Sequence, residues 1–203
     1  MTPNELRQFI SQKWQTLMTF VLVFVVFALM ITVVQPKKYK SEQRFLVLQE
    51  LAQDVDPYAA TRSTEYITNL FSKVMYSQDF QDKVIASSSQ LSEDLFASEP
   101  KERAKDWKKT VSTSVEGDSG ILEVAIYFPD RFQARELSFA VANVLKSSHQ
   151  NYHSRGDSIQ IKTIDAPITS VLPDQPNVPL NLLAGLVLGI IFAGIFIFLF
   201  PSR

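Results

Sequence analysis

The chain lacks cysteine and is poor in histidine and glycine, with Cys 0, His 2 and Gly 6 among 203 residues. The absence of cysteine excludes disulfides, thiolate metal sites and thiol nucleophiles. Neither charge is in excess, with 20 Lys and Arg against 21 Asp and Glu, so nucleic acid is not an expected partner. The sequence also has no P-loop, dinucleotide fingerprint, GxSxG or HExxH motif, and we expect no enzyme, no cofactor and no metal centre.

Two long apolar runs near the ends carry most of the hydrophobicity. Residues 17–34 contain only Thr19 and Thr32 as polar side chains, and residues 180–200 contain no charged side chain. Each run is long enough, at about 1.5 Å per residue, to cross a hydrocarbon core of about 30 Å. The first run exceeds the usual apolar stretch of a signal peptide and lacks a small-residue cleavage site, so we predict an uncleaved membrane helix instead of a secretion signal.

The two runs divide the chain into segments. We predict a cytoplasmic tail over residues 1–13, a first transmembrane helix over 14–35, an extracytoplasmic domain over 36–166, a proline-rich neck over 167–179, a second transmembrane helix over 180–200 and a cytoplasmic tail over 201–203. Arg7 and Lys13 favour a cytoplasmic N-terminus, although Lys37, Lys38 and Lys40 follow the first run directly. Because long loops are translocated largely regardless of charge, we place the large domain outside.

Hydrophobic periodicity between the runs predicts the order strand, helix, strand, strand, helix, strand. The strands fall at 39–48, 107–116, 121–128 and 158–165, and the helices at 63–85, broken near Ser77, and at 130–152, capped by Asp130. Residues 92–105 are assigned to a short helix or a loop, with Pro100 as a breaker. This order is that of the α+β ferredoxin-like fold (βαββαβ), whose right-handed crossovers place both helices on one sheet face.

Proline dominates the segment that leads into the second apolar run. Pro167, Pro173, Pro176 and Pro179 each fix φ and remove a backbone donor. We therefore expect residues 167–179 to run extended, as neither helix nor central strand, and to form a stiff neck on a membrane anchor.

Small residues mark the second apolar run itself. Gly185 and Gly189 form a GxxxG pattern, and Gly194 follows. This spacing permits close approach of a partner helix, either residues 17–34 of the same chain or a neighbour's helix. Asn181 could hydrogen-bond such a neighbour or lie at the membrane interface.

The remaining polar clusters are interpreted as structural. His149 and His153 share one helix face, but two imidazoles are fewer ligands than a zinc site needs, and we interpret them as solvated. Asp54 and Asp56 are interpreted as turn-forming acids before Pro57. A basic run is interpreted as a solvated face, with an anionic glycan, lipid phosphates or an acidic neighbouring subunit as weaker alternatives; it comprises Lys101, Arg103, Lys105, Lys108 and Lys109.

Together these features resemble the Wzz-type polysaccharide co-polymerase family, the chain length determinants. The resemblance covers the two membrane helices around an α+β domain, the strand from Tyr39, and residues 77–84 and 118–143. Its most specific part is the neck, which looks like the family's proline- and glycine-rich signature through Asp165-Ala-Pro167, Pro173, Pro176, Pro179-Leu-Asn181, Gly185 and Gly189.

This resemblance implies a two-pass protein of the bacterial inner membrane with a periplasmic domain. Such a domain assembles into a ring-shaped homo-oligomer and sets the chain length of lipopolysaccharide O-antigen, capsule or exopolysaccharide. It acts without catalysis, as a scaffold for the polysaccharide polymerase, with a lipid-linked glycan as a further candidate partner.

The chain departs from that family in two ways. Long members carry a helical extension that residues 36–166 are too short to hold, so we do not expect a tall ring. Only residues 201–203 follow the second apolar run, so we expect no fused tyrosine kinase. Two alternatives stay open, a membrane modulator of a bacterial tyrosine kinase and a structural adaptor of another envelope complex.

Overall fold

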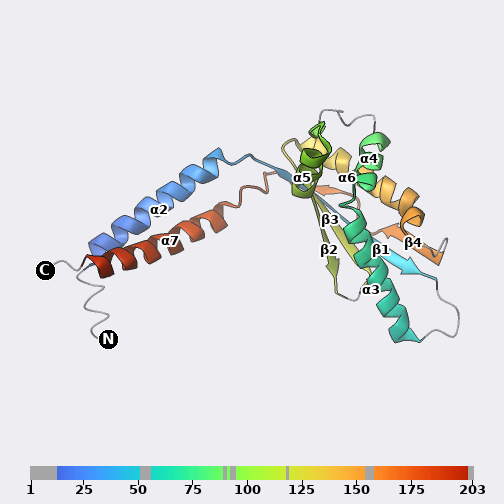
Figure 1. Ribbon diagram of the computed structural model, residues 1–203, viewed down its shortest axis with the longest axis horizontal. Coiled ribbons are helices and arrows are strands. Elements are labelled where there is room, and N and C mark those ends of the chain that lie inside the picture. The colour runs from blue at the N-terminus through green and yellow to red at the C-terminus, as the bar shows by residue number, and fades with distance from the viewer. Residues whose placement is uncertain are drawn as a thin grey trace. The chain divides into compact units, whose positions relative to one another are not determined.

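The computed structural model describes residues 13–50, 56–88, 91, 95–117, 119–153 and 158–200. The chain forms two compact units, one made of Met1–Lys37 with Gln175–Arg203 and the other of Lys38–Asp174. The first unit is a helical hairpin and the second is an α+β domain (Figure 1). Of the two predicted tails, only Lys13 is among the described residues, so Arg7 lies outside them. Asp54 and Asp118 also lie outside the described residues.

The hairpin unit consists of two apolar helices that run side by side (Figure 1). Helix α2 spans Trp14–Val34 and α7 spans Val178–Leu199, and each is long and apolar enough to cross a membrane. Helix α7 therefore begins at Val178, before the predicted boundary at residue 180. Asn177 caps it by accepting a hydrogen bond from the Leu180 N–H at 3.1 Å. Pro179 thus belongs to the first helical turn, where its missing N–H has no partner to lose.

The domain contains a five-stranded antiparallel sheet. Its strands are β1 (Tyr39–Gln49), β2 (Val111–Glu116), β3 (Ile121–Phe128), β4 (Ile159–Thr163) and β5 (Ile168–Thr169). They follow the spatial order β2-β3-β1-β4, and β5 pairs with β1 beside the segment that β4 covers. The domain is therefore a mixed α+β structure.

One face of the sheet is covered by helices. Along β1, Ser41, Gln43, Phe45 and Val47 are buried, while the alternate residues are partly exposed. Helices α3 (Pro57–Val74) and α6 (Arg131–Ser148) pack on the sheet, and α4 (Gln78–Ser87) packs on α6. The period-2 pattern thus gives the strand one buried face, from which Phe45 and Val47 enter the hydrophobic core.

Local capping fixes the helix boundaries. Ser77 accepts a hydrogen bond from the Phe80 N–H at 3.2 Å and so separates α3 from α4, which confirms the predicted break. Asp130 likewise accepts from the Gln133 N–H at 2.8 Å and begins α6 as predicted. Asp56 caps α3 through the Ala59 N–H at 3.2 Å, so the predicted turn before Pro57 is instead a helix start.

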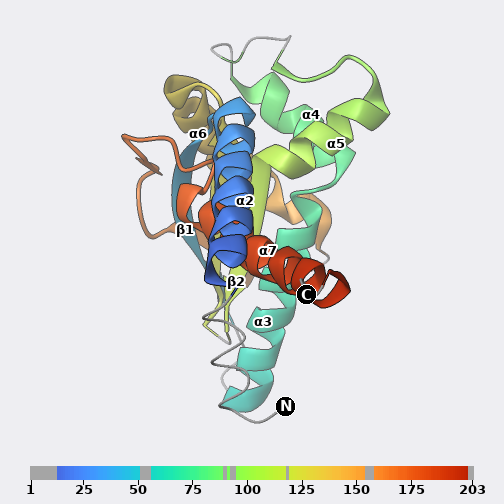
Figure 2. The ribbon, with the colours of Figure 1, turned by 90° about the vertical axis from the view of Figure 1, so that its left-hand side faces the viewer.

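The prediction of a strand from Trp107 was wrong. Residues Pro100–Thr110 form helix α5, and β2 begins only at Val111. Pro100 lies in the first turn, so it starts the helix and does not break it. Trp107 is buried, and its indole N–H donates to the Met75 carbonyl at 2.7 Å. Figure 2 shows α5 beside α4, where Arg103 and Asp82 form an ion pair at 3.5 Å.

Candidate functional site

The neck lies along the edge of β1. The Ser170 N–H of the neck donates to the Lys40 carbonyl of β1 at 2.8 Å, and the Asp174 N–H donates to the carbonyl of Lys38, just before β1, at 2.8 Å. Ahead of the neck, the Ile164 N–H donates to the Arg44 carbonyl of β1 at 2.9 Å. Pro167 and Pro173 fall between these donors, so no pairing N–H is lost, and an edge position tolerates proline. Within the predicted neck, Ile168–Thr169 form β5, the chain bends at residues 171–172, and Val178 and Pro179 already belong to α7, so only part of residues 167–179 runs extended. The neck residues up to Asp174 belong to the α+β unit.

Side chains add to this backbone pairing. The Lys40 N–H donates to the Ser170 hydroxyl at 3.0 Å, and the Ser41 and Thr169 hydroxyls lie 3.1 Å apart. Arg44 forms an ion pair with Asp165, with Nε and Oδ2 2.7 Å apart, and this hydrogen bond raises the pKa of Arg44. Both side chains are partly exposed, so solvent screens the ion pair and it contributes little to the stability of the fold.

A cavity of about 240 Å³ opens where β4 ends and β5 begins. Its charged lining is internally paired, because Lys40 forms an ion pair with Glu42 and Arg44 with Asp165. The hydrogen bond to Glu42 raises the pKa of Lys40. Gln43 also lines the cavity, and among the described residues its buried Oε1 has no hydrogen-bond partner. The charged side chains that line the cavity are therefore paired with one another.

In the hairpin unit, glycines let α7 approach α2 closely. A Cβ on Gly185 would lie 2.8 Å from the Ala28 Cβ, and one on Gly189 would lie 2.7 Å from the Val21 Cα. Of the two partners left open by the sequence, the helix of the same chain is the one that these glycines face. A Cβ on Gly194 would have no described heavy atom within 4 Å, so this glycine does not belong to the contact.

Asn181 joins the two helices through hydrogen bonds. Its amide Nδ2 donates to the Thr32 hydroxyl at 3.0 Å and to the Gln35 side-chain oxygen at 3.2 Å. The Thr32 hydroxyl in turn donates to the Ala28 carbonyl at 2.7 Å. Thr32 was visible in the sequence as a rare polar residue in an apolar run, but its partner could be found only from the helix pairing.

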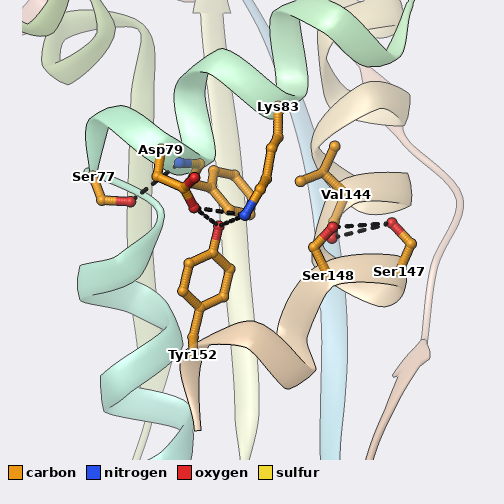
Figure 3. Close-up of polar contacts among 8 residues, drawn as sticks. Ser77, Asp79, Lys83, Val144, Ser147, Ser148 and Tyr152 are labelled. Carbon is orange, nitrogen blue, oxygen red and sulfur yellow. Dashed lines mark hydrogen bonds and ion pairs between the residues drawn. The ribbon is translucent and has the colours of Figure 1, made fainter.

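A polar cluster joins α4 to the 3-10 helix η2 (His149–Tyr152) (Figure 3). The Asp79 carboxylate accepts hydrogen bonds from Lys83 and from the Tyr152 hydroxyl, both at 2.6 Å. The hydrogen bond from Lys83 lowers the pKa of Asp79, whereas burial raises the pKa of Tyr152. The hydroxyl therefore keeps its proton near neutral pH, and the cluster fastens η2 to α4.

The two histidines differ from their prediction as solvated residues. His149 is 8% exposed and lies in the core beside Phe71, because α6 tightens into η2 and turns this side chain inward. Its Nδ1 lies 3.1 Å from Nε2 of His153. Within the described residues, no group of three or more His, Cys, Asp or Glu side chains is placed to hold a metal ion.

The basic run lies on α5 and is largely paired with acids. Lys105 lies 3.8 Å from Glu102, Lys109 lies 3.7 Å from Asp106, and Arg103 pairs with Asp82. Lys101 and Lys108 are exposed. This arrangement agrees with the interpretation of the run as a solvated helix face.

No protein-family model matches the sequence, and no curated protein matches it.

Proposed function

We propose that the protein regulates the chain length of a surface polysaccharide without catalysing a reaction. In this proposal it is a two-pass protein of the bacterial inner membrane. Its domain is periplasmic and forms a ring-like homo-oligomer that acts as a scaffold for the polysaccharide polymerase. The proposal rests on the resemblance of the neck and its flanking segments to the Wzz-type family, and on the two membrane-length helices that flank the domain.

The observation that carries the proposal is the pairing of the neck with β1. Lys38 and Asp174, the first and last residues of the domain, are hydrogen-bonded, so both connections to the hairpin start side by side, next to the beginning of β1. A scaffold that acts without catalysis must present its surface to the polymerase in a defined orientation. Two connections that start from paired residues restrict the orientation of the domain more than one flexible linker would.

We also propose that the domain is a variant of the ferredoxin-like fold. The antiparallel strand order β2-β3-β1-β4, with α6 between β3 and β4, supports this assignment. The variant differs in its first crossover, which contains α3, α4 and α5, and in the added pairing of β5 with β1.

Deletion of the gene in its host tests the function. We expect the polysaccharide ladder on a gel to lose its preferred length and to regain it when the wild-type chain is restored. An unchanged ladder would contradict chain-length control. An unchanged ladder with altered tyrosine phosphorylation would instead favour the kinase modulator.

Crosslinking of the intact protein tests the scaffold separately. We expect oligomers both in membranes and in mild detergent. A strictly monomeric protein in both environments would contradict the ring.

A further inference from the structure

A hollow of about 680 Å³ lies beside the first turns of α6. Arg131, Phe132 and Arg135 line it from the helix, and Pro167 and Thr169 line it from the neck. The Asp130 carboxylate already accepts the Gln133 N–H as the helix cap. Recognition of a ligand here would therefore come from the two guanidinium groups and the phenyl ring.

The two arginines lack acidic partners. Among the described residues, neither Arg131 nor Arg135 has a carboxylate within ion-pair distance, although Arg135 lies over the Phe139 ring at 5.5 Å. Phe132, between them in sequence, is 58% exposed. The α5 face has more basic residues, but most of those are paired with acids. Two unpaired cations around an exposed aromatic ring suit an interface between water and lipid headgroups.

The hollow belongs to the end of the domain where the chain enters and leaves. Thr169, in its lining, pairs with Ser41, and Phe128, just before α6, pairs with Tyr39. Only Gln175 to Asn177 separate Asp174 from the start of α7, and an extended chain covers at most about 3.5 Å per residue. A membrane spanned by α7 therefore begins within a short length of chain from this end.

Exposed apolar side chains occur on the same stretch of the neck. Val171 is 73% exposed and Leu172 is 76% exposed, and both lie between the paired residues Ser170 and Asp174. Neighbouring large apolar side chains at such exposure are typical of a surface that contacts a membrane or another protein.

We propose that Arg131, Phe132 and Arg135 bind the phosphate headgroups of anionic phospholipids in the bilayer that α2 and α7 span. The guanidinium groups bind the phosphate oxygens, and the phenyl ring lies at headgroup depth. This proposal rests on the membrane insertion that is part of the proposed function, but it is independent of the polysaccharide assignment. Because a basic residue near an anionic bilayer contributes about five-fold in affinity, we expect the two arginines together to contribute about twenty-five-fold.

A fluorescent label on the full-length protein tests the site, since the absence of cysteine allows labelling at one introduced position. We would introduce Phe132→Cys, attach an environment-sensitive fluorophore, and place the protein in nanodiscs of phosphatidylcholine with or without phosphatidylglycerol. We expect a blue shift of emission that increases with phosphatidylglycerol and that R131Q/R135Q abolishes. The matched control is Tyr66→Cys, because Tyr66 is 67% exposed and lies on α3 two residues after Thr64. Thr64 lies beside Gly120, at the other end of β3 from Phe128. Its emission should not depend on the lipid.

A second measurement keeps Phe132 intact. Mass spectrometry of lipids that co-purify with the full chain should show more anionic phospholipid bound to the wild type than to R131Q/R135Q. Equal lipid contents, or the same water-exposed emission at position 132 in both nanodiscs, would overturn the proposal. If inorganic phosphate produced the blue shift in phosphatidylcholine nanodiscs, the arginines would form a site for free anions, and the lipid proposal would be wrong. If the blue shift depended on protein concentration, position 132 would lie in a contact between subunits, and the lipid proposal would also be wrong. Failure of the chain to enter nanodiscs would instead contradict the proposed membrane insertion.

Discussion

The backbone N–H of Asp174 donates a hydrogen bond to the carbonyl oxygen of Lys38 at 2.8 Å. These two residues are the last and the first of the α+β unit, so its two connections to the hairpin start side by side. Between them and the body of the sheet, Ser170 pairs with Lys40 and Thr169 with Ser41. The neck is therefore fastened along β1 by a row of hydrogen bonds whose strength can be tested one position at a time.

Loss of the Ser170 N–H should open this row. Ser170→Pro leaves the Lys40 carbonyl without its donor, which should cost about 1 to 3 kcal/mol of local stability. Hydrogen exchange should then show faster exchange of the Asp174 amide. Ser170→Ala is the matched control, because it keeps the backbone donor and removes only the hydroxyl that accepts from the Lys40 N–H. Equal exchange rates in the two variants would show that the backbone pairing does not hold the neck.

Enlargement of Gly189 should separate the two hairpin helices. A leucine side chain there meets the backbone of Val21, which cannot move aside as a flexible side chain can, and such overpacking costs about 1 to 3 kcal/mol. Cysteines at Phe24 and Phe192, whose rings stack at 4.9 Å, should crosslink in the otherwise wild-type chain and lose that crosslink with Gly189→Leu. Gly194→Leu adds the same side chain where the described structure leaves space, so its crosslinking should be unchanged. A crosslink that survives Gly189→Leu would show that the close approach is dispensable.

The sequence predicted the elements that depend on local signals. The apolar runs, the helix break near Ser77, the cap at Asp130 and the strand β3 all come from neighbouring residues. The strand prediction from Trp107 was wrong because Trp107, Val111 and Val115 are spaced four residues apart. In so short a stretch this spacing fits both a helix and an alternating strand. Pro100 in the first turn, Glu102 near the start and Lys108 near the end were the helix signals that should have decided it.

The candidate site depended on pairings between distant residues. The proline pattern predicted an extended neck, but its contact with β1 joins residues far apart in sequence, such as Ser41 and Thr169. The inward turn of His149 likewise follows from the change of α6 into η2, which the i, i+4 spacing does not reveal. Periodicity identifies which residues share a face, whereas the partner of that face is set by the tertiary packing.

Asn181 and Thr32 should be energetically coupled across the hairpin. Asn181→Leu and Thr32→Val each remove one side of the 3.0 Å hydrogen bond, and a hydrogen bond between membrane helices contributes about 0.6 kcal/mol and at most about 1.7 kcal/mol. A double-mutant cycle on the unfolding free energy in detergent should give a coupling of that size. Thr19 is the control partner, because its hydroxyl donates within α2, to the Gln15 carbonyl at 2.9 Å, and not to α7 in the part of the chain that the structure describes. Additive effects of Asn181→Leu and Thr32→Val would contradict the contact.

The cluster of Asp79, Lys83 and Tyr152 should make the domain's stability depend on pH at both extremes. The pKa of Asp79 is lowered in the fold, so its contribution is present above the unfolded value of about 3.9 and is lost as pH falls through the folded pKa. The pKa values of Lys83 and Tyr152 are raised, so their contributions are present below the unfolded values of about 10.4 and 10 and are lost as pH rises through the folded values.

Variants of this cluster should reduce the pH dependence of the melting temperature at the acid and the alkaline extreme separately. Asp79→Asn should reduce the acid loss of the melting temperature, and Tyr152→Phe should reduce the alkaline loss, both measured by thermal unfolding across the pH range. Asp106→Asn removes an equivalent charge from the ion pair with Lys109 on α5 and serves as the control. If Asp79→Asn and Asp106→Asn changed the acid limb equally, the cluster would have no special role in the pH dependence.

The prolines of the neck should influence polysaccharide length according to where each lies. Pro173 adjoins the paired Asp174, whereas Pro179 lies in the first turn of α7 behind the Asn177 cap, where alanine is also accommodated. Replacement of Pro173 by Gly adds backbone freedom next to the Asp174–Lys38 bond, so on the proposed function it should broaden the length distribution or weaken the oligomer. Pro179→Ala should leave both nearly unchanged and is the matched control. The polysaccharide ladder and crosslinking of the intact protein measure the two effects. If Pro173→Gly behaved like the wild type in both assays, the neck would serve only to connect the domain to α7.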